Sequence, residues 1–425
     1  MDRRRLLQGL SLSAFSTRLL RTPPAYGQAA AYGQAAATPK QPEKPIGAND
    51  RVNVGVIGPG SRGLELTRQL LRIPGVEIIA VCDVYEPRFA QVNELVGKKV
   101  PGYKDFRELL ARRDLDAVFI ASPPVFHAEH VVASLNSGRP VYEEKTLGFT
   151  PEDCNKVVEA VRQSGQIFQI GHQMRYAAWI QAAMKRVQQG QIGNPTHVYG
   201  YWHRNDNWRR PVSDPGLEHL LNWRLYRESS GGLLEELGSH HIDIANWTFG
   251  EQPQSVLGSS SIAVYDDGRT VGDNVQAVFS YSKGRHMFFS SLTDNSLMAD
   301  QVWIYGTEGS LQITLEDATF YYEPEKHKAV VAPSGLVQKG LKTGASFAPN
   351  TAMPYRGIGE RVQVPNTEDF TLTACRSFIQ SVRTKQPPLA DVYVGYKSAL
   401  ACCIGRVALE EGQVKAIPRE IGGSG

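Results

Sequence analysis

The 425-residue chain lacks several features that would assign it to a specialised class of protein. It has no run of 18 or more apolar residues, so we expect no stable membrane insertion. Its five cysteines do not have the spacing of a metal site, and their odd number argues against a fully paired disulfide framework. The net charge of +3 arises in residues 1–37, which hold five arginines and one acid and leave −1 for the remainder. We therefore expect no nucleic-acid partner.

The first residues have the order of features of an export leader. Three arginines, Arg3 to Arg5, precede a short apolar stretch at 6–15, and small residues at 35–37 offer a cleavage site. The segment resembles a twin-arginine signal, which predicts export of the folded protein to the periplasm. The alternative is a disordered basic tail on a cytoplasmic protein. We assign 1–37 to the leader and the proline-containing residues 38–50 to a linker.

Strand and helix patterns alternate from residue 51 onward. The rhythm predicts parallel βαβ units, and hence an α/β Rossmann domain with a doubly wound parallel sheet over 51–171. Longer alternating stretches joined by tight turns follow. They predict an α+β domain over 172–425 with a large open, mainly antiparallel sheet. The clearest strand patterns are 52–57, 76–82, 117–121, 167–170, 196–202, 274–282 and 285–292.

A glycine-rich turn follows the first predicted strand and opens the first predicted helix. Gly58, Gly60 and Gly63 have the spacing of a dinucleotide-binding turn. In such a turn they allow, in that order, a tight bend, the approach of the pyrophosphate and close packing of helix on strand. The helix N-terminus offers free N–H groups, and Ser61 and Arg62 add side-chain donors. The alternative is a plain strand–helix turn.

The second predicted strand ends in an acid, Asp83, which stands 20 residues after Gly63. A carboxylate there accepts hydrogen bonds from the ribose hydroxyls and repels a 2′-phosphate, which favours NAD over NADP. Arg88 leaves NADP open as the less favoured cofactor, because an arginine can pair with that phosphate.

Two further motifs carry ionisable side chains suited to catalysis. Lys145 follows the fourth predicted strand, where a lysine can polarise an oxygen beside the nicotinamide; the alternative is a surface lysine paired with a neighbouring glutamate. Glu236 and His240 are four residues apart, so on a helix they share a face and form a possible general-base pair. His240 and His241 diverge on a helix, so no metal site is predicted.

With these motifs the chain resembles the Gfo/Idh/MocA oxidoreductase family over residues 51–420. The glycine turn, the Glu-Lys stretch and the segment from Gly231 to Asp243 look like motifs of that family, with Thr146 in place of its proline and Glu236 in place of its aspartate. The resemblance implies that Lys145 contacts the reacting oxygen and that His240 is the acid or base. Glu236 would orient His240 or touch the substrate.

The resemblance also extends to residues around these motifs. The stretch from Ile120 to His127 looks like the family segment before the nicotinamide, and 171–176 looks like the segment that lines the active site. Further cofactor contacts are therefore expected from Ser122, Pro123, His127, Glu144, Lys145 and Arg175. Substrate contacts are expected from Tyr176, Trp223, Arg224 and Asp243.

The stretch 202–228 is dense in aromatic side chains and arginines, which suit a sugar ring and its polar groups. A subunit interface favours the same residue types, so both readings stay open. The resemblance implies a homo-oligomer, a dimer or tetramer, built through the open sheet.

Together these features predict an NAD(P)-dependent oxidoreductase that moves a hydride between a nicotinamide and a hydroxyl or carbonyl of a sugar, sugar derivative or cyclitol. The alternative is an NAD-dependent glycosidase that works by transient oxidation and elimination. A binding protein without catalysis is disfavoured, because Lys145, Glu236 and His240 are all present.

Overall fold

The computed structural model describes residues 47, 50–323, 359–365 and 367–419, which belong to one compact unit. The predicted leader at 1–37 and most of the linker at 38–50 lie outside the described residues. These two assignments, and the domain boundary at 171/172, stay predictions.

The first half of the described chain forms the predicted doubly wound sheet. Six parallel strands lie in the order β3-β2-β1-β4-β5-β6, and the strand order reverses between β1 and β4, where a crevice opens at the carboxyl ends. Alternate strand residues enter two cores, one on each face of the sheet. The elements are β1 (Val52–Ile57), α1 (Ser61–Leu70), β2 (Val76–Cys82), α2 (Pro87–Val96), β3 (Gly102–Tyr103), α3 (Phe106–Leu110), β4 (Ala117–Ile120), η2 (Pro124–Phe126), α4 (His127–Asn136), β5 (Val141–Glu143), α5 (Pro151–Ser164) and β6 (Phe168–Ile170).

The second half forms a nine-stranded sheet in the order β14-β13-β12-β11-β7-β10-β9-β8-β15. Among the described strands β7 and β10 pair in parallel, and the other pairs are antiparallel, as expected for a mainly antiparallel sheet. The elements are η3 (Gln173–Tyr176), α6 (Ala178–Gln188), β7 (Pro195–His203), η4 (Pro215–Leu217), α7 (Glu218–Leu221), η5 (Trp223–Leu225), the π-helical turn η6 (Leu234–Gly238), α8 (Ser239–Phe249), β8 (Ser255–Ser261), β9 (Asn274–Ser280), η7 (Ser282–Gly284), β10 (His286–Leu292), β11 (Asp300–Gly306), β12 (Gly309–Thr314), β13 (Ala318–Tyr322), β14 (Glu360–Arg361) and β15 (Lys415–Ala416).

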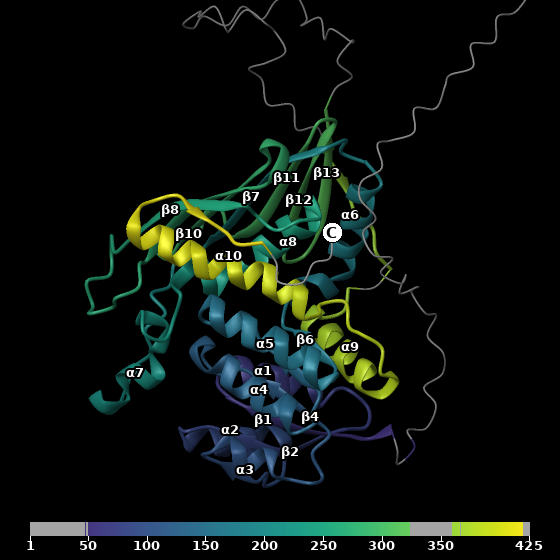
Figure 1. Cartoon of the computed structure of the whole chain (residues 1–425), viewed down its shortest axis with the longest axis vertical. Helices are drawn as coiled ribbons and strands as arrows, with labels where there is room; N and C mark the ends of the chain where they lie inside the picture. The colour runs from purple at the N-terminus through teal and green to yellow at the C-terminus, as the bar shows by residue number, and fades with distance from the viewer. Residues whose placement is uncertain (1–46, 48–49, 324–358, 366, 420–425) are drawn as a thin grey trace, which may run out of the picture. The chain divides into compact units, whose positions relative to one another are not determined.

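Two C-terminal helices join the halves. Asp369 is the N-cap of helix α9 (Phe370–Thr384), and its carboxylate accepts two backbone N–H groups of the first turn. The helix falls within the predicted second domain but packs on the first sheet, where the Phe378 ring lies 5.1 Å from that of Phe119. Helix α10 (Val392–Glu411) lies between the two sheets (Figure 1). It is long and apolar enough to cross a membrane, but 61% of its apolar window is buried in the fold, as in a core helix.

Candidate functional site

The turn between β1 and α1 uses each of its three glycines differently. Gly58 has a φ of 78°, and a Cβ atom there would lie 2.6 Å from the backbone nitrogen of Ser122. A Cβ atom at Gly63 would lie 2.3 Å from the Gly58 carbonyl oxygen, so helix and strand pack closely only with glycine there. A Cβ atom at Gly60 would meet no other atom within 4 Å, which leaves that backbone open to approach.

A groove of about 350 Å³ begins at this turn. Asp83, Arg88, Ser122 and Pro123 line it, and Asp83 Oδ1 accepts the backbone N–H of Tyr85 at 2.8 Å. Burial raises the pKa of Asp83, while that hydrogen bond and Arg88 act in the opposite direction. The groove therefore fits a dinucleotide: an open backbone for the pyrophosphate beside a helix N-terminus, and a carboxylate for the ribose.

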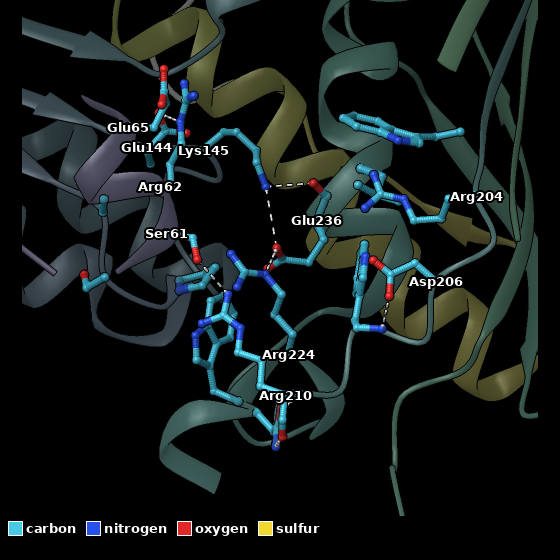
Figure 2. Close-up of a pocket in the computed structure, with 18 of the residues that line it drawn as sticks. Ser61, Arg62, Glu65, Glu144, Lys145, Arg204, Asp206, Arg210, Arg224 and Glu236 are labelled. Atoms are coloured by element: carbon cyan, nitrogen blue, oxygen red, sulfur yellow. Dashed lines mark hydrogen bonds and ion pairs between the residues drawn. The ribbon is translucent and has the colours of Figure 1, made fainter. Parts of the chain in front are cut away.

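Ser61 and Arg62 line the groove, but both already have polar partners (Figure 2). Arg62 Nε donates to Glu144 Oε1 at 2.8 Å, and Nη1 donates to Thr371 Oγ1 at 3.4 Å. Burial favours a lower pKa for Arg62, but Glu144, together with Tyr142 and Cys375, outweighs it and raises the pKa. Ser61 Oγ accepts from Arg210 Nη2 at 3.0 Å, so a residue of the second half reaches the glycine turn.

His127 does not reach the groove, contrary to the predicted cofactor contact. Its ring is 1% exposed, with Nδ1 2.6 Å from the Thr146 carbonyl oxygen and Nε2 2.8 Å from that of Ser122. Each ring nitrogen lies within hydrogen-bond distance of a backbone carbonyl, of which the neutral ring can donate to one, and so the ring joins the loops that follow β4 and β5. His127 is therefore a residue that positions these two loops.

Lys145 follows β5 and enters a larger cavity of about 600 Å³ (Figure 2). Its Nζ donates to the Glu236 carbonyl oxygen at 2.8 Å and lies 3.9 Å from Glu236 Oε2. The Lys145 side chain is 13% exposed, which disfavours the surface-lysine alternative. The peptide bond to Thr146 is cis, and Thr146 Oγ1 donates to Glu235 Oε1 at 2.6 Å.

The expected pairing of Glu236 with His240 is not formed. Glu236 lies in the π-helical turn that precedes α8. A π turn bonds residues five apart, so positions four apart no longer stand one above the other. The Glu236 carboxylate instead accepts from Arg224 Nε at 2.9 Å and faces Lys145 (Figure 2). The prediction that Glu236 orients His240 is wrong, which leaves contact with the substrate as its other predicted role.

His240 lines the larger cavity from α8 and is 3% exposed. Its ring packs against His172 and Trp202, with centroids 5.5 and 6.1 Å away, and its Nδ1 has no hydrogen-bond partner in the described part of the chain. Burial lowers the pKa of His240 well below its ordinary value, and His172 and Lys145 lower it further. The ring is therefore neutral at pH 7, the form that accepts a proton. Within the described ranges, no three His, Cys, Asp or Glu side chains gather as a metal site.

Three predicted site residues lie in the core and line neither cavity. Arg175 donates two hydrogen bonds to Asp243, at 2.7 and 2.8 Å, and its guanidinium lies over Trp247 at 4.8 Å. Tyr176 is 5% exposed, and its hydroxyl accepts the backbone N–H of Ala390 at 3.2 Å. The ion pair satisfies both charges internally. The predicted cofactor contact of Arg175 and substrate contacts of Tyr176 and Asp243 are therefore not supported.

Residues of the stretch 202–224 form the wall of the larger cavity that faces Lys145. Trp223 and Arg224 line it as predicted, with the guanidinium 4.2 Å from the indole centroid. Gln173 and Asn222 also line the cavity and were not predicted individually. They lie within the predicted stretches 171–176 and 202–228, but neither carries a charge or belongs to a motif that would distinguish it from its neighbours. The remaining aromatic and basic members of the wall are Trp202, Arg204, Trp208, Arg209 and Arg210.

Two family models match the chain, one in each of the two halves that form the cavity. One, described as an oxidoreductase family with an NAD-binding Rossmann fold, matches residues 52–172, and the other, the GFO/IDH/MocA C-terminal domain, matches 180–312. Together they cover more than half of the chain. The chain belongs to the Gfo/Idh/MocA oxidoreductase family. It is an oxidoreductase with a Rossmann domain of the NAD-binding type.

Relatives of this Gfo/Idh/MocA protein act on several carbohydrates. Myo-inositol 2-dehydrogenase of Thermotoga maritima is 24% identical over 87% of this chain and 100% of its own. The 2,7-anhydro-N-acetylneuraminate hydratase of Mediterraneibacter gnavus is 27% identical over 63% of this chain and 68% of its own. A levoglucosan dehydrogenase solved with NADH and levoglucosan superposes with a TM-score of 0.67 and 18% identity, over 87% of this chain and 100% of its own. At that identity the likeness shows the fold.

Proposed function

We propose that this oxidoreductase moves a hydride between NAD and the carbon of a hydroxyl or carbonyl group in a sugar, sugar derivative or cyclitol. The observation that carries the proposal is the continuity of the two cavities. Both are lined by Ser61, Ser122 and Arg224, and the larger one also holds Lys145 and His240. The relative named for myo-inositol supports this substrate class.

The side chains of the larger cavity suit the proton-transfer half of this reaction. When bound, NAD would supply the hydride acceptor. One N–H of Lys145 donates to the Glu236 carbonyl, which leaves others for a substrate oxygen. The lysine charge stabilises the alkoxide that forms as the hydroxyl proton leaves. His240, neutral because it is buried, accepts that proton. Glu236 faces two cations and stays charged, ready to accept a hydrogen bond from another hydroxyl.

Two substitutions test this chemistry, Lys145→Ala and His240→Ala. Each is expected to lower kcat/KM by about 10²-fold or more in an assay of reduced nicotinamide with a panel of sugars and cyclitols. Lys98→Ala, which removes an exposed lysine paired with Glu77, is the matched control. The fluorescence of bound NADH measures cofactor affinity, and so distinguishes a slower chemical step from weaker cofactor binding. Turnover at the wild-type rate in both variants would refute the proposal.

We propose NAD rather than NADP as the cofactor. Asp83 supports this choice, because it lines the groove at the end of β2, where a carboxylate repels a 2′-phosphate. Asp83→Ala should weaken NAD binding and narrow the preference over NADP in fluorescence titrations. A wild-type protein that binds NADP more tightly would contradict the choice.

We propose that the protein assembles as a homo-oligomer, a dimer or tetramer, through the open face of the nine-stranded sheet. Large aromatic side chains stand next to one another on that face: the Tyr199 ring lies 5.7 Å from Phe288 and 5.2 Å from Tyr305. Aromatic surface of this kind is typical of interfaces. Tyr199→Lys should lower the mass measured by light scattering, whereas Gln163→Lys on α5 should not. A monomeric wild-type protein would contradict the assignment.

We also propose that residues 1–37 direct export to the periplasm by a twin-arginine route. The order of arginines, apolar stretch and small residues supports this. Replacing Arg3, Arg4 and Arg5 by lysine should leave the protein in the cytoplasm on cell fractionation. Cytoplasmic wild-type protein would contradict the proposal.

A further inference from the structure

One arginine of the larger cavity differs from its neighbours in having no polar partner for its side chain. Its guanidinium makes no hydrogen bond or ion pair with the residues that the structure describes, and its Nε is buried without a partner. This residue is Arg204, on the loop that follows β7. Three neighbouring arginines form ion pairs: Arg62 with Glu144, Arg209 with Glu218 and Asp267, and Arg224 with Glu236. A fourth, Arg210, donates a hydrogen bond to Ser61 Oγ at 3.0 Å.

Arg204 is nevertheless held firmly. Its guanidinium carbon lies 5.1 Å from the centroid of the Trp202 ring and 4.9 Å from that of Trp208, so indole rings flank the charge. Its backbone N–H donates to the Leu292 carbonyl at 2.9 Å. Trp208 has a φ of 63°, a conformation uncommon outside glycine, and Asp206 Oδ1 accepts its backbone N–H at 3.0 Å. Trp208 thus has an unfavourable backbone conformation, and its side chain is the second ring beside Arg204.

This arrangement leaves a partly buried charge without an ion-pair partner among the described residues. Burial lowers the pKa of Arg204, and Asp206, Asp300 and Glu236 act in the opposite direction from beyond ion-pair distance. A charge removed from water without a partner costs free energy that an incoming anion offsets. In Figure 2 Arg204 stands on the other side of the cavity from Lys145, so an anion bound to it would leave the reacting end of a sugar free to meet the lysine.

We propose that the substrate is a sugar acid whose carboxylate binds Arg204, an inference that rests on the proposed function. Arg204 lines the cavity, and Nε is the guanidinium nitrogen that is buried without a partner. The Nη groups are therefore the donors for a planar carboxylate with two oxygens. The hydroxyl that reacts then lies at Lys145 and His240, remote from the carboxylate.

Calorimetric titration of the protein saturated with NAD tests the inference. The probes are matched pairs of acid and neutral sugar, glucuronate with glucose and galacturonate with galactose, and glucose 6-phosphate. At least one acid is expected to bind about tenfold or more tightly than its neutral partner. Arg204→Met should abolish that difference, and Arg204→Lys should keep part of it. Arg376→Met, an exposed arginine of α9 paired with Glu368, should keep all of it. Thermal unfolding of each variant identifies loss of folding.

Equal binding of acid and neutral sugars by the wild-type protein, or a preference that survives in folded Arg204→Met, would overturn the inference. If glucose 6-phosphate binds more tightly than the sugar acids, and this binding depends on Arg204, the preferred anion is a phosphate and the carboxylate assignment is overturned. NADH formation is followed separately. Acids that bind through Arg204 but are never oxidised would contradict the proposed function alone. Oxidation of neutral sugars without any effect of Arg204 would contradict this inference alone.

Discussion

Glu235 provides a prediction whose size follows from the structure. Its carboxylate is 1% exposed, and Oε1 accepts the Thr146 hydroxyl at 2.6 Å, while Oε2 is buried without a hydrogen bond. The nearest cation, Arg406, lies 3.8 Å from Oε2. Burial raises the pKa of Glu235 to about 7, although the Thr146 hydroxyl and Arg406 favour the charged form.

The effect on stability has a definite sign. The folded protein binds this proton more strongly than the unfolded chain, whose pKa is 4.5. The stabilising contribution is therefore complete below pH 4.5 and is lost as pH rises through about 7. At 1.36 kcal/mol for each pKa unit, the shift corresponds to about 3 kcal/mol of unfolding free energy. Glu235→Gln stays neutral and keeps an acceptor for Thr146, so it should not show this loss.

Urea denaturation at pH 5 and pH 8 measures the effect. The free energy of unfolding of Glu235→Gln, relative to wild type, should rise by about 2.5 kcal/mol between the two pH values, because a small part of the loss already occurs below pH 5. Because other groups titrate equally in both proteins, the difference isolates Glu235. Glu129→Gln, which changes an exposed glutamate paired with Arg107, should show no such rise. A pH dependence that is the same in wild type and Glu235→Gln would refute the reasoning.

Three other predictions concern the turn, the base and the core ion pair. Gly63→Ala should lower the unfolding free energy by about 1–3 kcal/mol, because its Cβ would press on the Gly58 carbonyl; unchanged urea denaturation would contradict this. The acid limb of kcat/KM should lie below pH 6.5, because burial keeps His240 neutral to lower pH, and a limb at or above that value in the pH profile would count against His240 as the base. Arg175→Met should lower the unfolding free energy by about 3–5 kcal/mol, since it leaves Asp243 buried and unpaired; stability within about 1 kcal/mol of wild type in urea would disprove this.

Local patterns were enough to predict the Rossmann sheet, because its strands and helices each follow their own periodicity along the chain. Strand β1 has the predicted bounds, 52–57. The sheet on which α9 packs could not be predicted from local patterns. An apolar stripe at 370–384 shows that the helix is buried on one side, but both sheets offer an apolar face, and only the packing shows that it covers the first.

The sequence predicted which residues line the candidate site better than it predicted which residues contact one another. Lys145 and His240 were identified by residue type and position, and both line the larger cavity. Their partners depend on backbone geometry that spacing does not reveal. Arg175 looked available because its ion-pair partner, Asp243, is 68 residues away in sequence. Long-range pairs of this kind decide whether a charged residue faces a ligand or the core.

The π turn shows how one such irregularity changes the chemistry of the site. In a regular α-helix each carbonyl accepts the N–H four residues later, and Glu236 would share a face with His240. In the π turn the Glu236 carbonyl accepts the ammonium of Lys145, and its carboxylate turns toward Arg224. The lysine of the first sheet is thereby held by the second half of the chain. His240 is released from a neighbouring carboxylate that would have raised its pKa, and so it keeps the neutral form that a base requires.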